Sequence, residues 1–181
     1  MIPKLVFILV SLALPMGCAI QHAQPPNTPR VEVAFSPEDG AEALVLKLLA
    51  SAQHSVRLAA YSFTSPSVVK GLMEAKRRGV DVKVLVDDKG NRGQASLAAM
   101  NLIAGAEIPI RKISAYSIHH DKYIIVDGRH TETGSFNFSQ AAAKSNSENV
   151  LVVWDNLPLA GRYLAHWESR WSQGVTVNLN Y

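Results

Sequence analysis

The part of this 181-residue sequence best equipped for chemistry is the stretch HHDKYIIVDGRHTETGSFN at residues 119–137. It holds histidines, cations and uncharged hydrogen-bond donors, but neither a cysteine nor a tight cluster of carboxylates. His120 and Lys122 lie two residues apart, as do Ser135 and Asn137, and residues at this spacing share one face of a β-strand. Pairing of the two segments as a hairpin would therefore present all four side chains to one site.

These side chains suit a phosphate group. Lysine supplies a permanent positive charge, the serine hydroxyl and asparagine amide supply neutral hydrogen bonds, and histidine acts as base, acid or nucleophile near neutral pH. Attack by His120 on phosphorus would give a covalent phosphohistidine and divide one displacement into two. Gly134, directly before Ser135, lets the backbone approach closely. A solvated surface strand is the structural alternative, and the four residues alone leave both interpretations open.

The elements that must position these residues alternate between strand and helix patterns. Strands are predicted at 31–35, 55–63, 80–86, 108–113, 122–126, 129–133 and 147–154. Helices are predicted at 36–53, 68–78, 94–104 and 158–173, with Ser36-Pro37 and Ser65-Pro66 as helix starts. Asp127-Gly128 is typical of a two-residue hairpin turn. This order predicts an α/β fold, a mixed β-sheet flanked by helices on both faces in an α-β-α sandwich.

The first residues differ in kind from the rest. A lysine at position 4 precedes an apolar run at 5–14 and small residues around Cys18, which is the order of a secretory signal. The run is about half of the ~20 residues that a membrane-spanning helix needs. We therefore divide the chain into a signal at 1–19, cleaved near 19–23, a proline-rich linker at 20–30 and one domain at 31–181.

Two fates of the mature protein stay open after this division. One is a soluble periplasmic or secreted product, and the other is a lipoprotein anchored through Cys18, the only cysteine. A membrane partner is expected only if Cys18 is lipidated. The formal net charge of +3 is mildly basic, and it permits a nucleic-acid or anionic-lipid partner without requiring one.

The spacing of the polar residues resembles a complete family signature. His120-x-Lys122, then Asp127, then Gly134-Ser135-x-Asn137 is similar to the HxKxxxxDxxxxxxGSxN motif of the phospholipase D superfamily. The segments AYSFTSP, KRRGVDVKVLVDD, ETGSFNFS and NSENVLVVW resemble the small, secreted, EDTA-resistant endonucleases of bacteria in that superfamily. The resemblance implies a phospholipase D/nuclease-like fold and a phosphodiesterase that needs no metal or other cofactor.

The resemblance also implies a role for each site residue. His120 would be the nucleophile that takes up the phosphoryl group, and Lys122 and Asn137 would hold the non-bridging oxygens. Ser135 would support this pocket. Glu148 stands where the superfamily has a carboxylate bonded to the catalytic imidazole, and such a carboxylate fixes the ring and stabilises its cationic form.

Four further residues are assigned more cautiously. Asp127 belongs to the signature, but it lies at an odd offset from His120 and begins the Asp-Gly turn, so we predict that it shapes the turn. Arg111 and Lys112 directly precede the site and are candidates for phosphate contact. His119 is a candidate for substrate contact with no required chemistry.

The single motif predicts a homodimer. An in-line displacement at phosphorus needs a nucleophile on one side and a proton donor for the leaving oxygen on the other. His120 is the only histidine in the sequence with a lysine two residues later. Two copies of His120 meeting near a two-fold axis would supply both groups.

The remaining hypotheses about function differ in the substrate. The leading one is a non-specific endonuclease that hydrolyses DNA through a phosphohistidine intermediate, with RNA cleavage left open. The alternative is a phospholipase D-type lipid phosphodiesterase that uses the same residues. A binding or structural protein with an inactive site is a third class, and the intact set of site residues argues against it.

Overall fold

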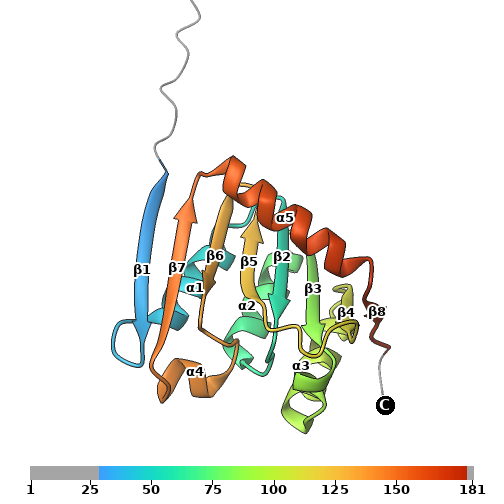
Figure 1. Cartoon of the computed structure of the whole chain (residues 1–181). Helices are drawn as coiled ribbons and strands as arrows, with labels where there is room; N and C mark the ends of the chain where they lie inside the picture. The colour runs from blue at the N-terminus through green and yellow to red at the C-terminus, as the bar shows by residue number, and fades with distance from the viewer. Residues whose placement is uncertain (1–28, 179–181) are drawn as a thin grey trace, which may run out of the picture.

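An eight-stranded mixed sheet forms the centre of the computed structural model, which describes residues 29–178 (Figure 1). The strands lie in the order β1-β7-β6-β5-β2-β3-β4-β8. Strands β2, β3 and β4 are parallel to one another, and every other neighbouring pair is antiparallel. Their bounds are β1 Arg30–Ser36, β2 Ser55–Ala60, β3 Asp81–Asp87, β4 Ile110–Ile113, β5 Lys122–Val126, β6 His130–Gly134, β7 Glu148–Trp154 and β8 Val175–Thr176.

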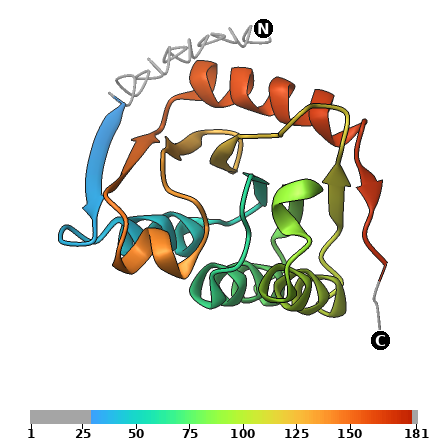
Figure 2. The same cartoon turned by 60° about the horizontal axis from the view of Figure 1, so that its bottom comes forward.

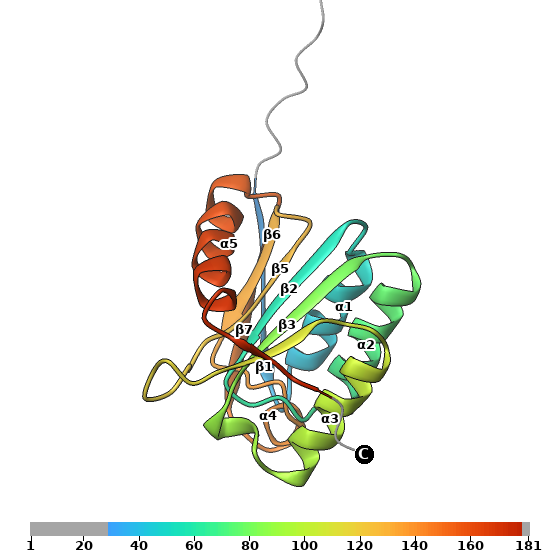
Figure 3. The same cartoon turned by 90° about the vertical axis from the view of Figure 1, so that its right-hand side faces the viewer.

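Helices cover both faces of this sheet, which confirms the predicted α-β-α sandwich. Figures 2 and 3 show α5 on one face and α1, α2 and α3 on the other. A short helix, α4, and a 3-10 turn, η1, lie near one end of the strands. The bounds are α1 Ala41–Ser51, α2 Pro66–Arg77, η1 Lys89–Asn91, α3 Gln94–Gly105, α4 Gln140–Lys144 and α5 Leu157–Trp171. Among the described residues, no helix has the length and apolar content needed to cross a membrane.

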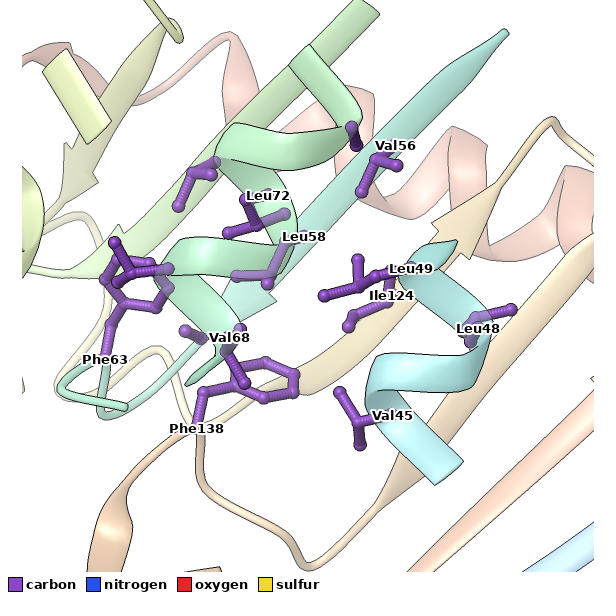
Figure 4. Packing of buried hydrophobic residues seen from close by; sticks show 14 of the residues in the cluster. Val45, Leu48, Leu49, Val56, Leu58, Phe63, Val68, Leu72, Ile124 and Phe138 are labelled. Carbon is purple, nitrogen blue, oxygen red and sulfur yellow. The ribbon is translucent and has the colours of Figure 1, made fainter. Parts of the chain in front are cut away.

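The larger core lies between the sheet and helices α1 to α3. Aliphatic side chains of α1 and α2 interlock there with those of the central strands, as Leu49, Leu72 and Leu58 show in Figure 4. All three are almost completely buried, and burial of a side chain of this size contributes about 1.5–3 kcal/mol. This layer holds the central strands, and therefore their ends, in fixed positions.

The smaller core lies under α5. Trp167 is buried and donates its indole N–H to the carbonyl oxygen of Leu58 over 3.0 Å, while Trp171 stacks on it at 4.8 Å. Tyr163 packs against the same cluster. These three aromatic residues, which recur at helical spacing along α5, therefore serve core packing.

One predicted helix start is wrong. The segment after Ser36 does not begin a helix, because α1 begins at Ala41 with Gly40 as its N-cap. Ser36 is the last residue of β1, and its hydroxyl donates to the carbonyl oxygen of Ala142 over 2.6 Å. At Ser65 the same kind of signal works as predicted, since its side chain accepts a hydrogen bond from the backbone N–H of Val68. The predicted second strand also ends early, at Ala60.

The turn between β5 and β6 is fastened to the start of β2. Asp127 and Gly128 both have positive φ, 54° and 62°, as a two-residue hairpin turn requires. The Asp127 carboxylate accepts hydrogen bonds from the backbone N–H groups of residues 53, 54 and 55 at 3.0, 2.7 and 2.8 Å. Burial pushes the pKa of this carboxyl up, but the three N–H donors outweigh burial and hold the pKa below its usual value.

Residues 1–28 lie outside the described part of the chain. They include the predicted signal with its cleavage region, Cys18 and all but the end of the predicted linker. The expectations for them therefore stay predictions.

Candidate active site

The residues of the signature, apart from Asp127, lie near the start of β5 and the end of β6. Lys122 is the first residue of β5 and pairs with Ala60, the last residue of β2. His120 stands in the loop directly before β5, so the two residues do not share one regular strand as predicted. Instead, the Lys122 ammonium turns back and donates to the carbonyl oxygen of His120 over 3.0 Å. The imidazole is exposed, whereas Lys122 is only 7% exposed.

Tyr61 is a site residue to which the sequence reasoning gave no role. It follows β2 directly, and its ring lies 4.6 Å from that of His120 with the planes tilted by 60°. The Lys122 Nζ lies 5.3 Å from the centroid of the same ring, within the range of a cation–π contact. One aromatic side chain thus contacts both members of the His-x-Lys pair. Its position immediately after a buried strand, at the same edge of the sheet, is the sequence signal that could have identified it.

Burial and nearby carboxylates act on Lys122 in opposite directions. Burial is the larger effect and lowers the pKa of the ammonium below its ordinary value. The carboxylates of Glu148 and Asp121 oppose it by favouring the charged form. A partly desolvated cation of this kind interacts more strongly with an incoming anion than a solvated surface lysine does.

Ser135 and Glu148 form one hydrogen-bonded unit beside this cation. The Ser135 hydroxyl donates to Glu148 Oε2 over 2.6 Å and accepts from the backbone and side-chain N–H groups of Asn149 at 3.1 and 3.2 Å. The other carboxylate oxygen accepts from the side chain of Asn146 at 3.0 Å. Within residues 29–178, Glu148 therefore bonds Ser135 and Asn146, and not the His120 imidazole that the resemblance implies as its partner.

Gly134 and Asn137 bracket this unit. A Cβ atom on Gly134 would stand 2.1 Å from the carbonyl oxygen of Asn149, so only glycine permits β6 and β7 to approach this closely. Strand β6 ends at Gly134, and Ser135 and Asn137 both lie beyond it, contrary to the predicted strand face. The side chain of Asn137 makes no hydrogen bond within the described part of the chain, and its Oδ1 is buried. Its amide is therefore not occupied by a contact within the described residues.

A cavity of about 480 Å³ opens beside His120 and Lys122 on the α5 face of the sheet. Asp121 lies in its wall and binds two further histidines, with Oδ2 2.9 Å from Nε2 of His166 and 3.4 Å from Nδ1 of His119. The residues that line the cavity are His120, Asp121, Lys122, Tyr123, Thr133, Gly134, Leu159, Arg162, Tyr163 and His166. Site residues and α5 thus share one opening to solvent.

His119 was predicted to contact the substrate, but its side chain does not line this opening. Its side chain is 3% exposed, and its backbone N–H donates to Asp87 Oδ1 over 2.6 Å. Burial lowers the pKa of the imidazole, against the opposing influence of Asp121 and Asp87. The expectation of substrate contact is therefore corrected, because the side chain is enclosed by protein.

Arg111 and Lys112, which were predicted to contact phosphate, do not lie at the site either. Both lie on β4, which β2 and β3 separate from β5. Arg111 donates to the carbonyl oxygen of Trp171 over 2.9 Å and stacks on its ring, and Lys112 pairs with Asp88 at 3.1 Å. These internal contacts take up both cations. Asp127 lies at the opposite end of β5 from Lys122, at the turn where it was expected.

No group of three or more histidine, cysteine, aspartate or glutamate side chains within residues 29–178 could hold a metal ion. The site offers the imidazole of His120 and the ammonium of Lys122, and the amide of Asn137 in the loop after β6 has no partner among the described residues. This set suits the oxygens of a phosphate.

We compared the chain with protein families, with individual relatives and with solved structures, and all three comparisons point to the same family. The family described as "Cardiolipin synthase, PLD-like domain" matches residues 45–171. "Phospholipase D" of Rickettsia bellii is 34% identical over 161 residues, which cover 83% of this chain and 79% of that protein. "Mitochondrial cardiolipin hydrolase" of Xenopus laevis is 32% identical over 79% of this chain and 67% of its own length.

Two solved structures have the same fold. The crystal structure of Nuc from Salmonella typhimurium, a phospholipase D family member, is 52% identical with a TM-score of 0.83, and the match covers 83% of this chain and 99% of that one. NucT from Helicobacter pylori is 21% identical with a TM-score of 0.72 over 83% of this chain and 100% of that one, a likeness of fold.

Proposed function

Because this chain belongs to the phospholipase D superfamily and is a phosphodiesterase of that family, we propose that it is a metal-independent endonuclease that hydrolyses DNA. The observation that carries the proposal is the exposed imidazole of His120 beside the buried ammonium of Lys122, at the mouth of a cavity. The close resemblance of the flanking segments to EDTA-resistant endonucleases favours DNA over a lipid.

In the first step, a ring nitrogen of His120 attacks phosphorus and forms the N–P bond while the bond to the leaving oxygen breaks. Lys122 and Asn137 hold the non-bridging oxygens, where negative charge concentrates in the transition state. Ser135 and Glu148 keep the neighbouring loop in place. The protonated imidazolium of the partner subunit's His120 gives its proton to the leaving oxygen.

In the second step, the partner subunit's His120, now neutral, takes a proton from water. The resulting hydroxide attacks phosphorus, the N–P bond breaks, and the imidazole of His120 is released. Tyr61 supports both steps, because its ring contacts His120 and limits the orientations that the imidazole can adopt.

A bare strip of the sheet supports the proposed homodimer. Helix α5 packs on β2, β4, β5 and β6, and it leaves the β1–β7 end of the same face without a helix (Figure 1). Val31, Val33 and Phe35 of β1 point to this side and are 51–55% exposed. Phe35 pairs with Asn149, the residue that bonds Ser135. The strip is therefore continuous with the active site, and a second copy seated on it would bring two sites together.

Replacing Val33 by aspartate is expected to weaken self-association by about 30-fold or more, because an interface residue of this kind is worth about 2 kcal/mol. Sedimentation should then report single copies at concentrations where the unchanged protein is dimeric, and nuclease activity should fall in parallel. Val175→Asp is the matched control, since Val175 is 69% exposed on β8 at the other end of the sheet. A dimeric, fully active Val33→Asp protein would remove this strip from the interface.

The proposed chemistry is tested by incubating the protein with plasmid DNA and with phosphatidylcholine, each in excess EDTA. We expect DNA to be cleaved at an unchanged rate and no choline to be released. Loss of DNA cleavage in EDTA would refute the metal-free mechanism. Release of choline with intact DNA would instead support the alternative, a phospholipase D-type lipid phosphodiesterase, which the names of the 32–34% identical relatives favour.

A further inference from the structure

Arg162 is a cation with no structural task. It lies on α5, its side chain is exposed, and it makes no hydrogen bond or ion pair within residues 29–178. Yet it lines the same cavity as His120 and Lys122. The other arginine of α5, Arg170, packs over the ring of Tyr116 at 4.9 Å. Arg162 therefore brings an uncompensated positive charge to the opening of the active site.

His166 stands one helical turn further along α5 and lines the same cavity. Side chains four residues apart on a helix lie about 5–6 Å from each other, close enough to contact one ligand group. Asp121 holds the His166 ring, with 2.9 Å between its Oδ2 and Nε2. Asp121 immediately follows His120, so this contact also fixes α5 relative to the catalytic loop. In the imidazolium form of His166 the other ring nitrogen, Nδ1, also carries a proton, which it can donate to an oxygen of a ligand.

The cavity is larger than one phosphate requires. Its volume of about 480 Å³ lies in the usual range for sites that hold a small molecule. Lys122 lies on the strand side of this opening. Arg162 and His166 lie on the helix side of the same opening. One cavity is thus lined both by His120 and Lys122, from the loop and the start of β5, and by Arg162 and His166 from α5.

We propose that Arg162 and His166 form a second phosphate subsite, which binds a phosphate next to the one that His120 attacks. The inference rests on the proposed function and narrows its substrate class to a chain of consecutive phosphodiesters, as in a nucleic-acid strand. A guanidinium gives two parallel hydrogen bonds to a phosphate, which sets the register of the strand as well as its affinity. Bases play no part in these contacts, so the subsite adds affinity without sequence preference.

The first test compares two substrates of the full-length protein. Arg162→Ala should raise KM for a single-stranded oligonucleotide about tenfold. Bis(4-nitrophenyl) phosphate has only one phosphate. The factor by which Arg162→Ala raises KM for this substrate should be at least fivefold smaller than the factor for the oligonucleotide. Arg162→Lys should recover part of the loss, and His166→Gln should lower activity on the oligonucleotide in the same selective way. Equal losses on both substrates, or none on the oligonucleotide, would overturn the subsite.

Arg77→Ala is the matched control. Arg77 is an exposed arginine of α2, on the opposite face of the sheet, so the substitution removes the same charge at a distance from the cavity. It should leave both substrates unaffected. The salt dependence gives an independent measure, because each phosphate of a single strand that the protein neutralises adds about 0.7 to the steepness of log affinity against log salt. Arg162→Ala should make this dependence shallower by that amount, and Arg77→Ala should not.

A competition experiment separates failure of the subsite from failure of the proposed function. Thymidine 3′,5′-bisphosphate, with two phosphates, should inhibit hydrolysis of bis(4-nitrophenyl) phosphate about tenfold more strongly than thymidine 5′-monophosphate. In Arg162→Ala the advantage should disappear. An unchanged advantage overturns the subsite even if DNA is cleaved. A lost advantage supports the subsite even if intact DNA proves a poor substrate, which would count against the proposed function alone.

Discussion

Replacing His120 by alanine is expected to lower DNA hydrolysis by about four orders of magnitude or more, because the change removes the nucleophile that forms the N–P bond. The side chain is exposed, so the folded structure should persist with an unchanged melting temperature. His54→Ala is the control, since that exposed histidine lies near the Asp127 turn at the opposite end of β2. Initial rates on plasmid DNA measure both variants.

Mixed dimers extend this result to the shared site. If each turnover needs two copies of His120, a dimer of one unchanged and one His120→Ala subunit is inactive. A tenfold excess of the variant, after subunit exchange, should then reduce the activity of the unchanged protein by about tenfold, since most of its subunits acquire an inactive partner. Undiminished activity under these conditions would show that a single His120 suffices.

Replacing Glu132 by glutamine is expected to stabilise the protein at neutral pH. Glu132 lies on β6 between Ile124 and Val152, both in the core under α1 to α3. It is 0% exposed, and neither carboxylate oxygen has a hydrogen-bond partner within the described residues. Burial alone raises the pKa of this carboxyl well above its ordinary value.

The pH dependence follows from the sign of this shift. Because the folded pKa is raised, the folded state holds a proton that the unfolded state has already released. Stability is therefore greatest below the unfolded pKa, about 4.3, and is lost as the pH rises toward the folded pKa, at about 1.4 kcal/mol per pH unit. Glutamine carries no such proton, so the advantage of the variant should grow from pH 5 upward.

Urea unfolding at a series of pH values measures this difference. Glu38→Gln serves as control, because Glu38 is exposed in the turn after β1, and it should show no comparable gain. An identical pH profile for the unchanged protein and Glu132→Gln would mean that the carboxyl finds a partner in solution. Melting temperatures of the two variants at pH 8 give a second readout.

The fold could be predicted from the sequence because its signals are local. The strand pattern of residues 122–126 and the Asp127-Gly128 turn each depend on neighbours in the sequence, and both appear as expected. The failure at Ser36 has the opposite cause. Its Ser-Pro signal equals that of Ser65, but pairing of β1 with β7 and a bond to Ala142 hold Ser36 in the sheet. A local sequence pattern cannot indicate contacts between residues that lie so far apart in the chain.

The geometry of the site could not be predicted from the sequence. The rule that residues two apart share a face applies within a regular strand, and His120 and Asn137 both lie outside one. The contact between Asp121 and His166 joins residues that are 45 positions apart, so spacing could not reveal it. Likewise, nothing in the sequence indicates that the guanidinium of Arg111 packs on the ring of Trp171.

The pairing of β1 with β7 also sets a condition on how the chain acquires its structure. The first described strand has only the last long strand as its neighbour, and Ser36 reaches a partner 106 residues later. A chain emerging from the ribosome therefore cannot complete this sheet until β7 has been synthesised. Until then β1 has no strand to pair with, and its backbone N–H and C=O groups lack their partners in the sheet. Folding is thus coupled to the completion of translation, and fragments that end before β7 are expected to aggregate.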